Sequence, residues 1–292
     1  MGALTGKAVV ITGSGRGIGA GCARGAARQG AAVVVNDVNP AGIEETVDAI
    51  RAQGGTAIGC LADVADWDDA ELLVRKCIES FGKIDGLVNN AGLAHIAGIH
   101  EFDPVAARAL VDVNVMGTLY CTARAVKPML AQRSGSIVNV ISGAHMGLPR
   151  LSVYAASKGA VASMVYSWAL ELKGSGVRVN ALSPVAGGTG MSPADPLNQS
   201  PEANSPVVEY LLSDLSSHVS GQLVRIDKGE IHLYTHPALL MPPAVRPTWS
   251  LESIADAFQN EFQDRQVACG VMGMESLPVN VQTGYWTRKS GN

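Results

Sequence analysis

The sequence AVVITGSGRGIGAGCARGAARQG, residues 8–30, decides the fold. Its first four residues form a short apolar run, rich in β-branched side chains, that is typical of a buried strand and ends at Thr12-Gly13. Residues 18–29 favour a helix, and Gly30 follows them as glycine often follows a helix. The glycine-rich segment between the two therefore forms a strand-to-helix turn.

This turn has the chemistry of a phosphate-binding loop. Glycines let the backbone approach a diphosphate closely, and the next helix presents free N–H groups and the positive end of its dipole. The spacing is T-G-x-x-x-G-x-G, which is wider than G-x-G-x-x-G. A generic glycine-rich turn is the alternative, but the position after a first strand favours a dinucleotide site. The candidate cofactor residues here are Gly13, Arg16, Gly17, Ile18 and Gly19.

Strand and helix patterns alternate outward from this turn. Apolar runs predict further strands at 32–35, 56–61, 86–88, 136–140, 178–182 and, as the final one, 222–226. Helices are predicted at 40–51, 68–81, 104–132, 152–173 and 207–212, and Pro128 is expected to end or kink the longest. Strands of nearly continuous apolar character, spaced by helices, indicate an α/β fold with a doubly wound parallel sheet.

The composition divides the chain into a single domain, residues 1–233, and a C-terminal extension, residues 234–292. Residues 186–206 are rich in Gly, Pro, Ser and Asn and predict a loop, whereas residues 251–262 predict an amphipathic helix. The apolar side chains of the extension require burial against the body or a neighbouring subunit. These side chains are Trp249, Phe258, Phe262, Tyr285 and Trp286.

Composition also limits the partners. The 292 residues are 47% hydrophobic with a formal net charge of −4, and there is no long run of Lys or Arg of the kind that binds a nucleic acid. No apolar run is long enough to cross a bilayer, and the first residues lack a signal-peptide layout. The 5 cysteines lack metal-ligand spacing. We expect a cytoplasmic protein that acts on a small molecule without nucleic acid, membrane or metal.

An acidic residue, Asp37, follows the second predicted strand. A carboxylate at this position can accept hydrogen bonds from both ribose hydroxyls of adenosine and repels a 2′-phosphate, so it favours NAD over NADP. An aspartate that forms a turn before Pro40 is the alternative interpretation. Arg16 acts in the opposite direction, because a cation there could meet a 2′-phosphate.

Polar residues also follow the third and fourth predicted strands, at the edge where doubly wound sheets bind ligands. Asp63 could accept a hydrogen bond from the adenine amino group or cap the next helix, a role for which Asp66 competes. The pair Asn89-Asn90 could also form an ordinary turn. The candidate cofactor residues in these two segments are Asp63, Val64, Asn90, Ala91 and Gly92.

A tyrosine and a lysine, Tyr154 and Lys158, open a predicted helix four residues apart and therefore share one face. A phenol with an ordinary pKa of about 10 is a poor base at neutral pH. A nearby ammonium lowers that pKa and makes proton transfer from an alcohol feasible. The alternative is a surface tyrosine and lysine that share a face by chance.

Two further polar residues, Ser142 and Asn114, belong to the candidate catalytic set, and a histidine is a candidate substrate contact. Ser142 follows the fifth strand, where it could donate a hydrogen bond to a substrate oxygen. Asn114 lies inside a predicted helix, where it could hold a water or a relay to Lys158, or be a satisfied surface amide. His145, three residues after Ser142, is the histidine expected to contact a substrate.

Together these motifs resemble the classical short-chain dehydrogenase/reductase family. The similar segments run in order from about residue 4 to residue 229 and include TGSGRGIG, NNAG at 89–92 and YAASK at 154–158. The resemblance implies a single Rossmann domain. It implies that Tyr154 is the acid/base, that Lys158 binds the nicotinamide ribose and lowers the Tyr154 pKa, that Ser142 orients the substrate and that Asn114 holds a relay water.

The resemblance extends to the loop after the sixth strand. NALSP at 180–184 is similar to the family's segment, so Pro184 and Thr189 are implied to lie at the nicotinamide, although Val185 stands where the family usually has glycine. An NAD-dependent interconversion of a secondary alcohol and a ketone, by a homodimer or homotetramer, is implied.

Residues 205–214 and the extension resemble a branch of peroxisomal-type (3R)-hydroxyacyl-CoA dehydrogenases. That branch implies a bulky substrate, either a hydroxyacyl thioester or a steroid-like alcohol. A dehydrogenase of a small or aromatic alcohol is one alternative, and a non-catalytic dinucleotide-sensing module is another.

Overall fold

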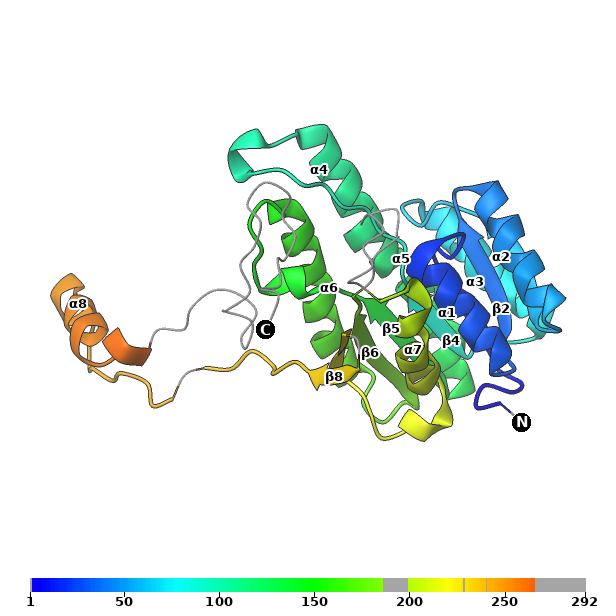
Figure 1. The fold of residues 1–292 in the computed structure, drawn as a ribbon. Coiled ribbons are helices and arrows are strands. Elements are labelled where there is room, and N and C mark those ends of the chain that lie inside the picture. The colour runs from blue at the N-terminus through cyan, green and yellow to red at the C-terminus, as the bar shows by residue number, and fades with distance from the viewer. Residues whose placement is uncertain (1, 186–198, 228, 240, 266–292) are drawn as a thin grey trace, which may run out of the picture.

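A central sheet organises the computed structural model, which describes residues 2–185, 199–227, 229–239 and 241–265 (Figure 1). Its strand order is β3-β2-β1-β4-β5-β6-β7-β8, and all neighbours are parallel except β7 and β8. The predicted doubly wound α/β fold is therefore confirmed. The strands are β1 (Ala8–Ile11), β2 (Ala32–Asp37), β3 (Thr56–Leu61), β4 (Gly86–Asn89), β5 (Gly135–Val140), β6 (Val177–Ser183), β7 (Leu223–Asp227) and β8 (Glu230–Leu233).

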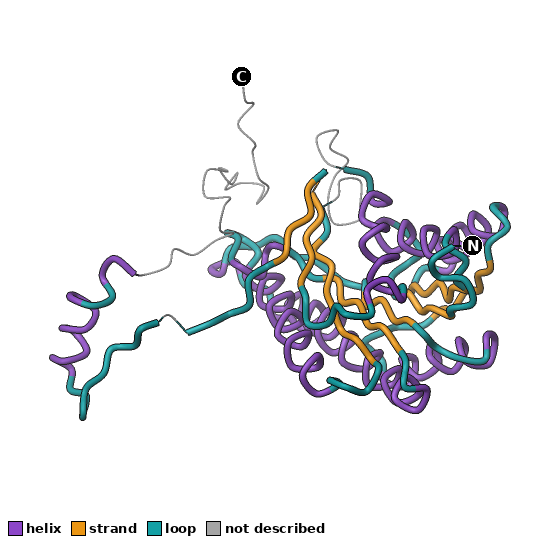
Figure 2. The backbone as a smooth tube through the Cα atoms, turned by 90° about the horizontal axis from the view of Figure 1, so that it is seen from below, coloured by secondary structure: helices purple, strands orange, loops and turns teal. Residues whose placement is uncertain are grey.

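Helices cover both faces of the sheet (Figure 2). One face carries α1, α2 and α7, and the other carries α3, α5 and α6. The helices are α1 (Gly17–Arg28), α2 (Pro40–Ala52), α3 (Trp67–Phe81), α4 (Pro104–Val111), α5 (Gly117–Gln132), α6 (Ser152–Glu171), α7 (Ser205–Leu212) and α8 (Leu251–Asn260).

Alternating side chains of each strand enter two separate apolar cores. In β1, Val9 and Ile11 pack under α1 and α7, whereas Ala8 and Val10 pack under the helices of the opposite face. Because both faces are buried, the strands need apolar residues at nearly every position. This requirement explains why the sequence shows continuous apolar runs rather than the polar–apolar alternation of a half-exposed sheet.

The long helical region at 104–132 departs from regular α-helix at a place that the sequence did not predict. A π-helical segment, Asp112–Met116, separates α4 from α5, whereas Pro128 lies inside α5, which continues to Gln132. Of the two outcomes expected at Pro128, an end or a kink, the structure excludes the end. The neighbouring residues Ala125 and Met129 are fully buried, and this core packing offsets the hydrogen bond that proline removes.

The final strand is another difference, because β8 follows the strand that was expected to be last. It pairs antiparallel with β7, with Arg225 opposite His232 and Asp227 opposite Glu230. All four β8 side chains are exposed and backbone hydrogen bonds to β7 hold the strand, whose polar–apolar alternation over only four residues, Glu230 to Leu233, is a weak signal. The residue after it, Tyr234, donates its backbone N–H to the carbonyl oxygen of Leu223 at 3.0 Å.

The extension beyond β8 leads to α8, which stands away from the sheet (Figure 1). The predicted helix is present, but Trp249 and Phe258 remain 45% and 55% exposed, so they are not buried against the body of their own chain. Tyr285 and Trp286 lie outside the described residues. Across the ranges that the structure describes, none of the helices has the length and apolar character that crossing a membrane requires.

Candidate active site

The glycine turn after β1 closes tightly against the end of β4. Gly13 and Gly17 have φ values of 59° and 57°, in the left-handed region that favours glycine. A Cβ on Gly13 would lie 2.7 Å from the Cα of Ala91. Arg16, the residue before α1, makes no capping hydrogen bond with its side chain. The exposed N–H end of α1 and the compact turn fit the diphosphate of a dinucleotide.

Asp37 lies beside this turn at the end of β2. Its Oδ2 accepts a hydrogen bond from the Gly15 backbone N–H at 3.1 Å, and its Oδ1 accepts one from Asn39 N–H at 3.1 Å. The bond from Asn39 N–H is that of an Asx turn, so Asp37 does form the turn before Pro40 that the alternative interpretation expected, while Asn39 caps α2 by accepting from Ala41 N–H. The carboxylate is part of the glycine turn, where a ribose of the bound dinucleotide would lie.

The residues after β4 brace the turn. The Asn90 amide nitrogen donates to the carbonyl oxygens of Thr12 and Gly13, each at 2.9 Å. The backbone N–H groups of Asn90 and Ala91 both donate to Thr12 Oγ1 at 3.0 Å. The Asn90 side chain therefore holds the backbone of the glycine turn in place. This is a more specific role than that of an ordinary turn residue.

The two aspartates after β3 have different roles. Asp66 caps α3, since its side chain accepts from the backbone N–H groups of Asp68 and Asp69. Asp63 instead accepts from Ala65 N–H at 2.9 Å. The structure thus assigns the helix cap to Asp66 and leaves Asp63 at the carboxyl edge of the sheet, next to the buried Val64.

Asn114 is buried in the π-helical segment and links two elements of the site. Its Oδ1 accepts from Leu93 N–H at 2.7 Å, and its Nδ2 donates to the Leu93 carbonyl oxygen at 2.9 Å. Nδ2 also donates to Ser157 Oγ at 3.0 Å, one residue before Lys158. The interpretation of Asn114 as a surface amide is wrong, because its side chain joins the loop after β4 to α6.

Lys158 and Tyr154 lie on one face of α6, as their spacing predicts. Lys158 is 4% exposed, its Nζ donates to the Val140 carbonyl oxygen at 2.7 Å, and it lies 5.8 Å from the centroid of the Tyr154 ring. Burial lowers the pKa of Lys158 to about 8. This value leaves the ammonium charged near neutral pH.

The pKa of Tyr154 shifts in the direction opposite to the prediction. Burial raises the pKa of the phenol, and a hydrogen bond with the Ser142 side chain opposes that rise. Within the protein chain, desolvation therefore outweighs the lowering that Lys158 was expected to cause. The influence of Ser142 on this pKa indicates that two of the predicted catalytic side chains, from α6 and the segment after β5, lie near each other.

His145 lies next to this pair. Its backbone N–H donates to the Ser142 carbonyl oxygen at 3.1 Å, and its ring Nδ1 lies 2.6 Å from the same oxygen. Its ring meets the ring of Tyr234 edge-on, with centroids 5.0 Å apart. Sequence reasoning missed Tyr234, because no motif marks a residue of an unpredicted strand end.

The loop after β6 has a second unpredicted residue. Asn204, fully buried, accepts at Oδ1 from Val185 N–H and donates from Nδ2 to the Val185 carbonyl oxygen. It thereby holds the backbone next to Pro184. A buried polar residue in a loop of Pro, Ser and Asn has no periodic signal that would identify it. Thr189 lies outside the described residues.

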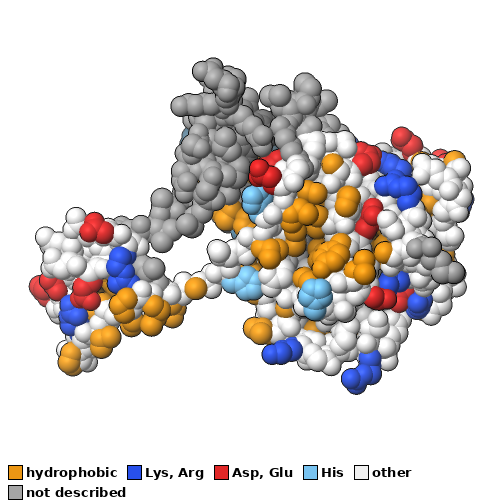
Figure 3. Space-filling view, turned by 60° about the horizontal axis from the view of Figure 1, so that its bottom comes forward, with side chains coloured by type: hydrophobic (Ala, Val, Ile, Leu, Met, Phe, Trp, Pro, Cys, Tyr) orange, Lys and Arg blue, Asp and Glu red, His pale blue; other side chains and the backbone are white. Residues whose placement is uncertain are grey.

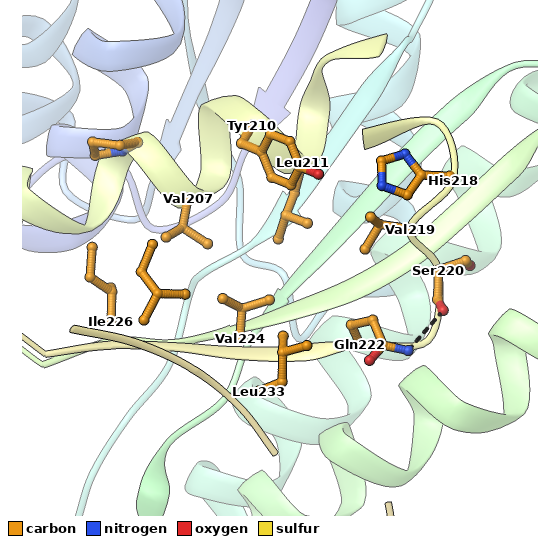
Figure 4. Close-up of a pocket in the computed structure, with 12 residues that line it drawn as sticks. Val207, Tyr210, Leu211, His218, Val219, Ser220, Gln222, Val224, Ile226 and Leu233 are labelled. Carbon is orange, nitrogen blue, oxygen red and sulfur yellow. Dashed lines mark hydrogen bonds between the residues drawn. The ribbon is translucent and has the colours of Figure 1, made fainter. Parts of the chain in front are cut away.

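A separate cavity of about 440 Å³ lies between α7 and the β7–β8 pair. Hydrophobic side chains gather on this face of the molecule (Figure 3). Val207 and Leu211 approach from α7, and Val224, Ile226 and Leu233 approach from the strands (Figure 4). The cavity shares no residue with the catalytic set.

No group of three or more His, Cys, Asp or Glu residues is arranged to hold a metal in the described part of the chain.

The burial of Lys158 predicts a pH-dependent stability. Its pKa is about 8 in the folded chain and 10.5 when exposed, so the unfolded chain binds more protons between these values. The wild type should therefore gain roughly 1–2 kcal/mol of unfolding free energy relative to Lys158→Met between pH ~7.5 and ~9.5. Urea unfolding of both proteins at the two pH values measures the change. If the difference in unfolding free energy between wild type and Lys158→Met is the same at both pH values, the lowered pKa of Lys158 is contradicted.

Comparison with known proteins identifies the family. The short chain dehydrogenase pattern matches residues 7–199. The chain is 36% identical over 240 residues to cis-4-hydroxycyclohexanecarboxylate dehydrogenase of Sinomonas cyclohexanicum, covering 76% of this chain and 96% of that one. It is 34% identical over 241 residues to the 3-oxoacyl-acyl-carrier-protein reductase of Thermotoga maritima, covering 77% and 98%.

A solved structure agrees with these sequence matches. The crystal structure of a short chain dehydrogenase from Mycobacterium avium has a TM-score of 0.84 and 28% identity, covering 93% of this chain and 100% of that one. The chain therefore belongs to the short-chain dehydrogenase family, whose oxidoreductases use nicotinamide dinucleotides and act on alcohol- or ketone-type substrates.

Proposed function

We propose that this protein interconverts a secondary alcohol and a ketone with NAD. The observation that carries the proposal is the buried ammonium of Lys158, bonded to the carbonyl oxygen at the end of β5 and 5.8 Å from the Tyr154 ring, at the sheet edge that also bears Ser142 and the glycine turn. Three groups that can orient an oxygen atom and move its proton thus lie at one end of β5. When bound, the nicotinamide supplies the two-electron acceptor or donor that the protein lacks.

The chain's own residues supply the proton chemistry. Ser142 holds the substrate oxygen through its hydroxyl, and Tyr154 transfers the proton at that oxygen. Burial favours the protonated phenol, which is suited to donating a proton to a carbonyl oxygen. In the oxidative direction Lys158 stabilises the phenolate through its positive charge. Asn114 supports α6 through Ser157 and is the proposed anchor of a relay water.

The proposed cofactor residues belong to the glycine turn and to the segments that follow β2, β3, β4 and β6 in the sequence. They comprise Gly13, Arg16, Gly17, Ile18, Gly19, Asp37, Asp63, Val64, Asn90, Ala91, Gly92, Pro184 and Thr189, with Tyr154 and Lys158 at the nicotinamide. Asp37 supports NAD over NADP, because its carboxylate stands at the turn whereas a 2′-phosphate would be repelled there.

The proposed substrate is bulky, either a hydroxyacyl thioester or a steroid-like alcohol. The similarity to an acyl-carrier-protein reductase supports the thioester, and the similarity to a hydroxycyclohexanecarboxylate dehydrogenase supports a small cyclic alcohol as the alternative. The hydroxyacyl-CoA dehydrogenase branch and a cytoplasmic location stay predictions.

Replacing the proton-transfer group tests the activity. With NAD and either 3-hydroxybutyryl-CoA or cis-4-hydroxycyclohexanecarboxylate, Tyr154→Phe should lower kcat about 100-fold or more, because the ring remains but no proton can move. Absorbance of the reduced nicotinamide follows turnover, and Tyr120→Phe on α5 is the control. Retained turnover in Tyr154→Phe would remove the assignment, and NAD binding without turnover on any alcohol would favour the sensing module.

The role of Asp37 is tested by cofactor affinity. Asp37→Ala should weaken NAD binding about 10-fold or more and strengthen NADP binding, because charged hydrogen bonds to the ribose are lost together with the repulsion of a 2′-phosphate. Titration calorimetry measures both affinities, and Asp48→Ala on the exposed face of α2 is the control for loss of one negative charge. If the ratio of NAD affinity to NADP affinity is the same in Asp37→Ala as in the wild type, Asp37 does not set the cofactor preference.

We also propose that residues 234–292 form an extension that packs at its start, at Tyr234 and His236, on the body of its own chain and through α8 on a neighbouring subunit of a homodimer or homotetramer. An isolated helix as short as α8 is marginal in water, so its apolar face requires a partner. Leu251, Ile254 and Phe258 of this face are exposed in the single chain. This arrangement would account for the apolar side chains that the body of the same chain does not cover.

Sedimentation velocity tests this packing. Phe258→Asp places a charge on the apolar face of α8 and should shift the oligomer toward a smaller species, because an unpaired buried charge is costly. Gln259→Asp adds the same charge at an exposed neighbouring position and should leave the sedimentation coefficient unchanged. Identical coefficients for wild type and Phe258→Asp would exclude α8 from the subunit contact.

A further inference from the structure

One side chain of the extension reaches the catalytic edge of the sheet. Since β8 runs back along β7, Tyr234 meets the start of β7, with its backbone N–H bonded to the Leu223 carbonyl oxygen. Its side chain is partly buried against the apolar core under α6. Its hydroxyl lies 3.0 Å from Ser183 Oγ, and its ring centroid lies 5.0 Å from that of His145 at an interplanar angle of 68°.

Both contacts lead to a residue of the proposed site. His145 belongs to the short 3₁₀ turn that Ser142 caps, and its Nδ1 lies 2.6 Å from the Ser142 carbonyl oxygen. Ser183 is the last residue of β6 and directly precedes Pro184. Tyr234 therefore touches the loop that positions the substrate-orienting hydroxyl and the start of the loop assigned to the nicotinamide.

Backbone bonds join β5 and β6 up to the start of these two loops. β5 and β6 pair through Val140 and Leu182, and the backbone N–H of Ile141 donates to the Leu182 carbonyl oxygen. β5 ends at Val140, and β6 ends at Ser183. The Tyr234 side chain, which bonds to Ser183 and packs on His145, links the two loops just beyond the paired part of β5 and β6.

We propose that Tyr234 is a positioning residue, which clamps the loops after β5 and β6 so that Ser142 and the Pro184 segment keep a common geometry. The inference rests on the proposed function, because it assigns those loops to substrate and cofactor. Misplacing a reacting group by about 1 Å can lower a rate by about 100-fold. Loss of a contact that contributes little to the free energy of unfolding can therefore have a large effect on kcat.

The clamp is distinct from a mere anchor of the extension. His236, two residues later, holds the same segment through its ring contact with Tyr166, whose centroid is 4.6 Å away. That contact lies in the C-terminal half of α6 and involves neither Ser142 nor Ser183. If Tyr234 only fastened the extension to the body, loosening His236 would have the same effect on the site.

Three full-chain variants separate these roles: Tyr234→Phe, Tyr234→Ala and His236→Ala. With NAD and cis-4-hydroxycyclohexanecarboxylate or 3-hydroxybutyryl-CoA, Tyr234→Phe should lower kcat about 3- to 10-fold, the equivalent of one ordinary hydrogen bond. Tyr234→Ala should lower kcat about 30-fold or more, since the ring contact is lost as well. NAD affinity, which depends mainly on the glycine turn, should stay within about 2-fold, and His236→Ala should retain wild-type kcat.

Hydrogen exchange gives a readout that needs no turnover. Amides of residues 141–147 and 183–185 should exchange several-fold faster in Tyr234→Ala than in His236→Ala, whereas the turn at residues 12–19 should not change. If Tyr154→Phe retains activity, the proposed function fails while this exchange result still tests the clamp. If Tyr154→Phe is inactive but Tyr234→Phe and Tyr234→Ala match His236→Ala in kcat and exchange, the clamp alone is overturned.

Discussion

The hydrogen bond from the Lys158 ammonium to the Val140 carbonyl oxygen is the interaction on which the site depends. It brings a buried positive charge to the carboxyl end of β5, directly beside the turn that carries Ser142. A charge in that position is costly unless it is hydrogen-bonded, so the geometry of α6 relative to the sheet is tightly constrained. Tyr154, one helical turn earlier, is placed by the same constraint.

The parallel sheet explains why residues from distant parts of the sequence meet at this point. All parallel strands end at one edge, so the segments after β1, β2, β4, β5 and β6 share it. Hydrogen bonds then join those segments in pairs: Gly15 to Asp37, Asn90 to Gly13, and Asn114 to Ser157. The site is therefore a network of braced loops rather than a set of independent side chains.

Much of this arrangement could be predicted from the sequence, because it depends on local patterns. The strands from β1 to β7 are apolar runs, and the left-handed turn requires glycine at positions such as Gly13. The strand β8 and the residues Tyr234 and Asn204 could not be predicted in the same way. β8 is held by backbone pairing with exposed side chains, and the other two act through contacts with residues far away in sequence.

The sequence by itself determined the α/β class, the glycine turn and the common face of Tyr154 and Lys158, since all three follow from the spacing of neighbouring residues. Only the tertiary structure decided that Asp66 rather than Asp63 caps α3, that the helix break falls at Asp112–Met116, and that burial raises the pKa of the Tyr154 phenol. These outcomes depend on which groups are desolvated or paired across elements, and spacing along the chain carries no information about desolvation.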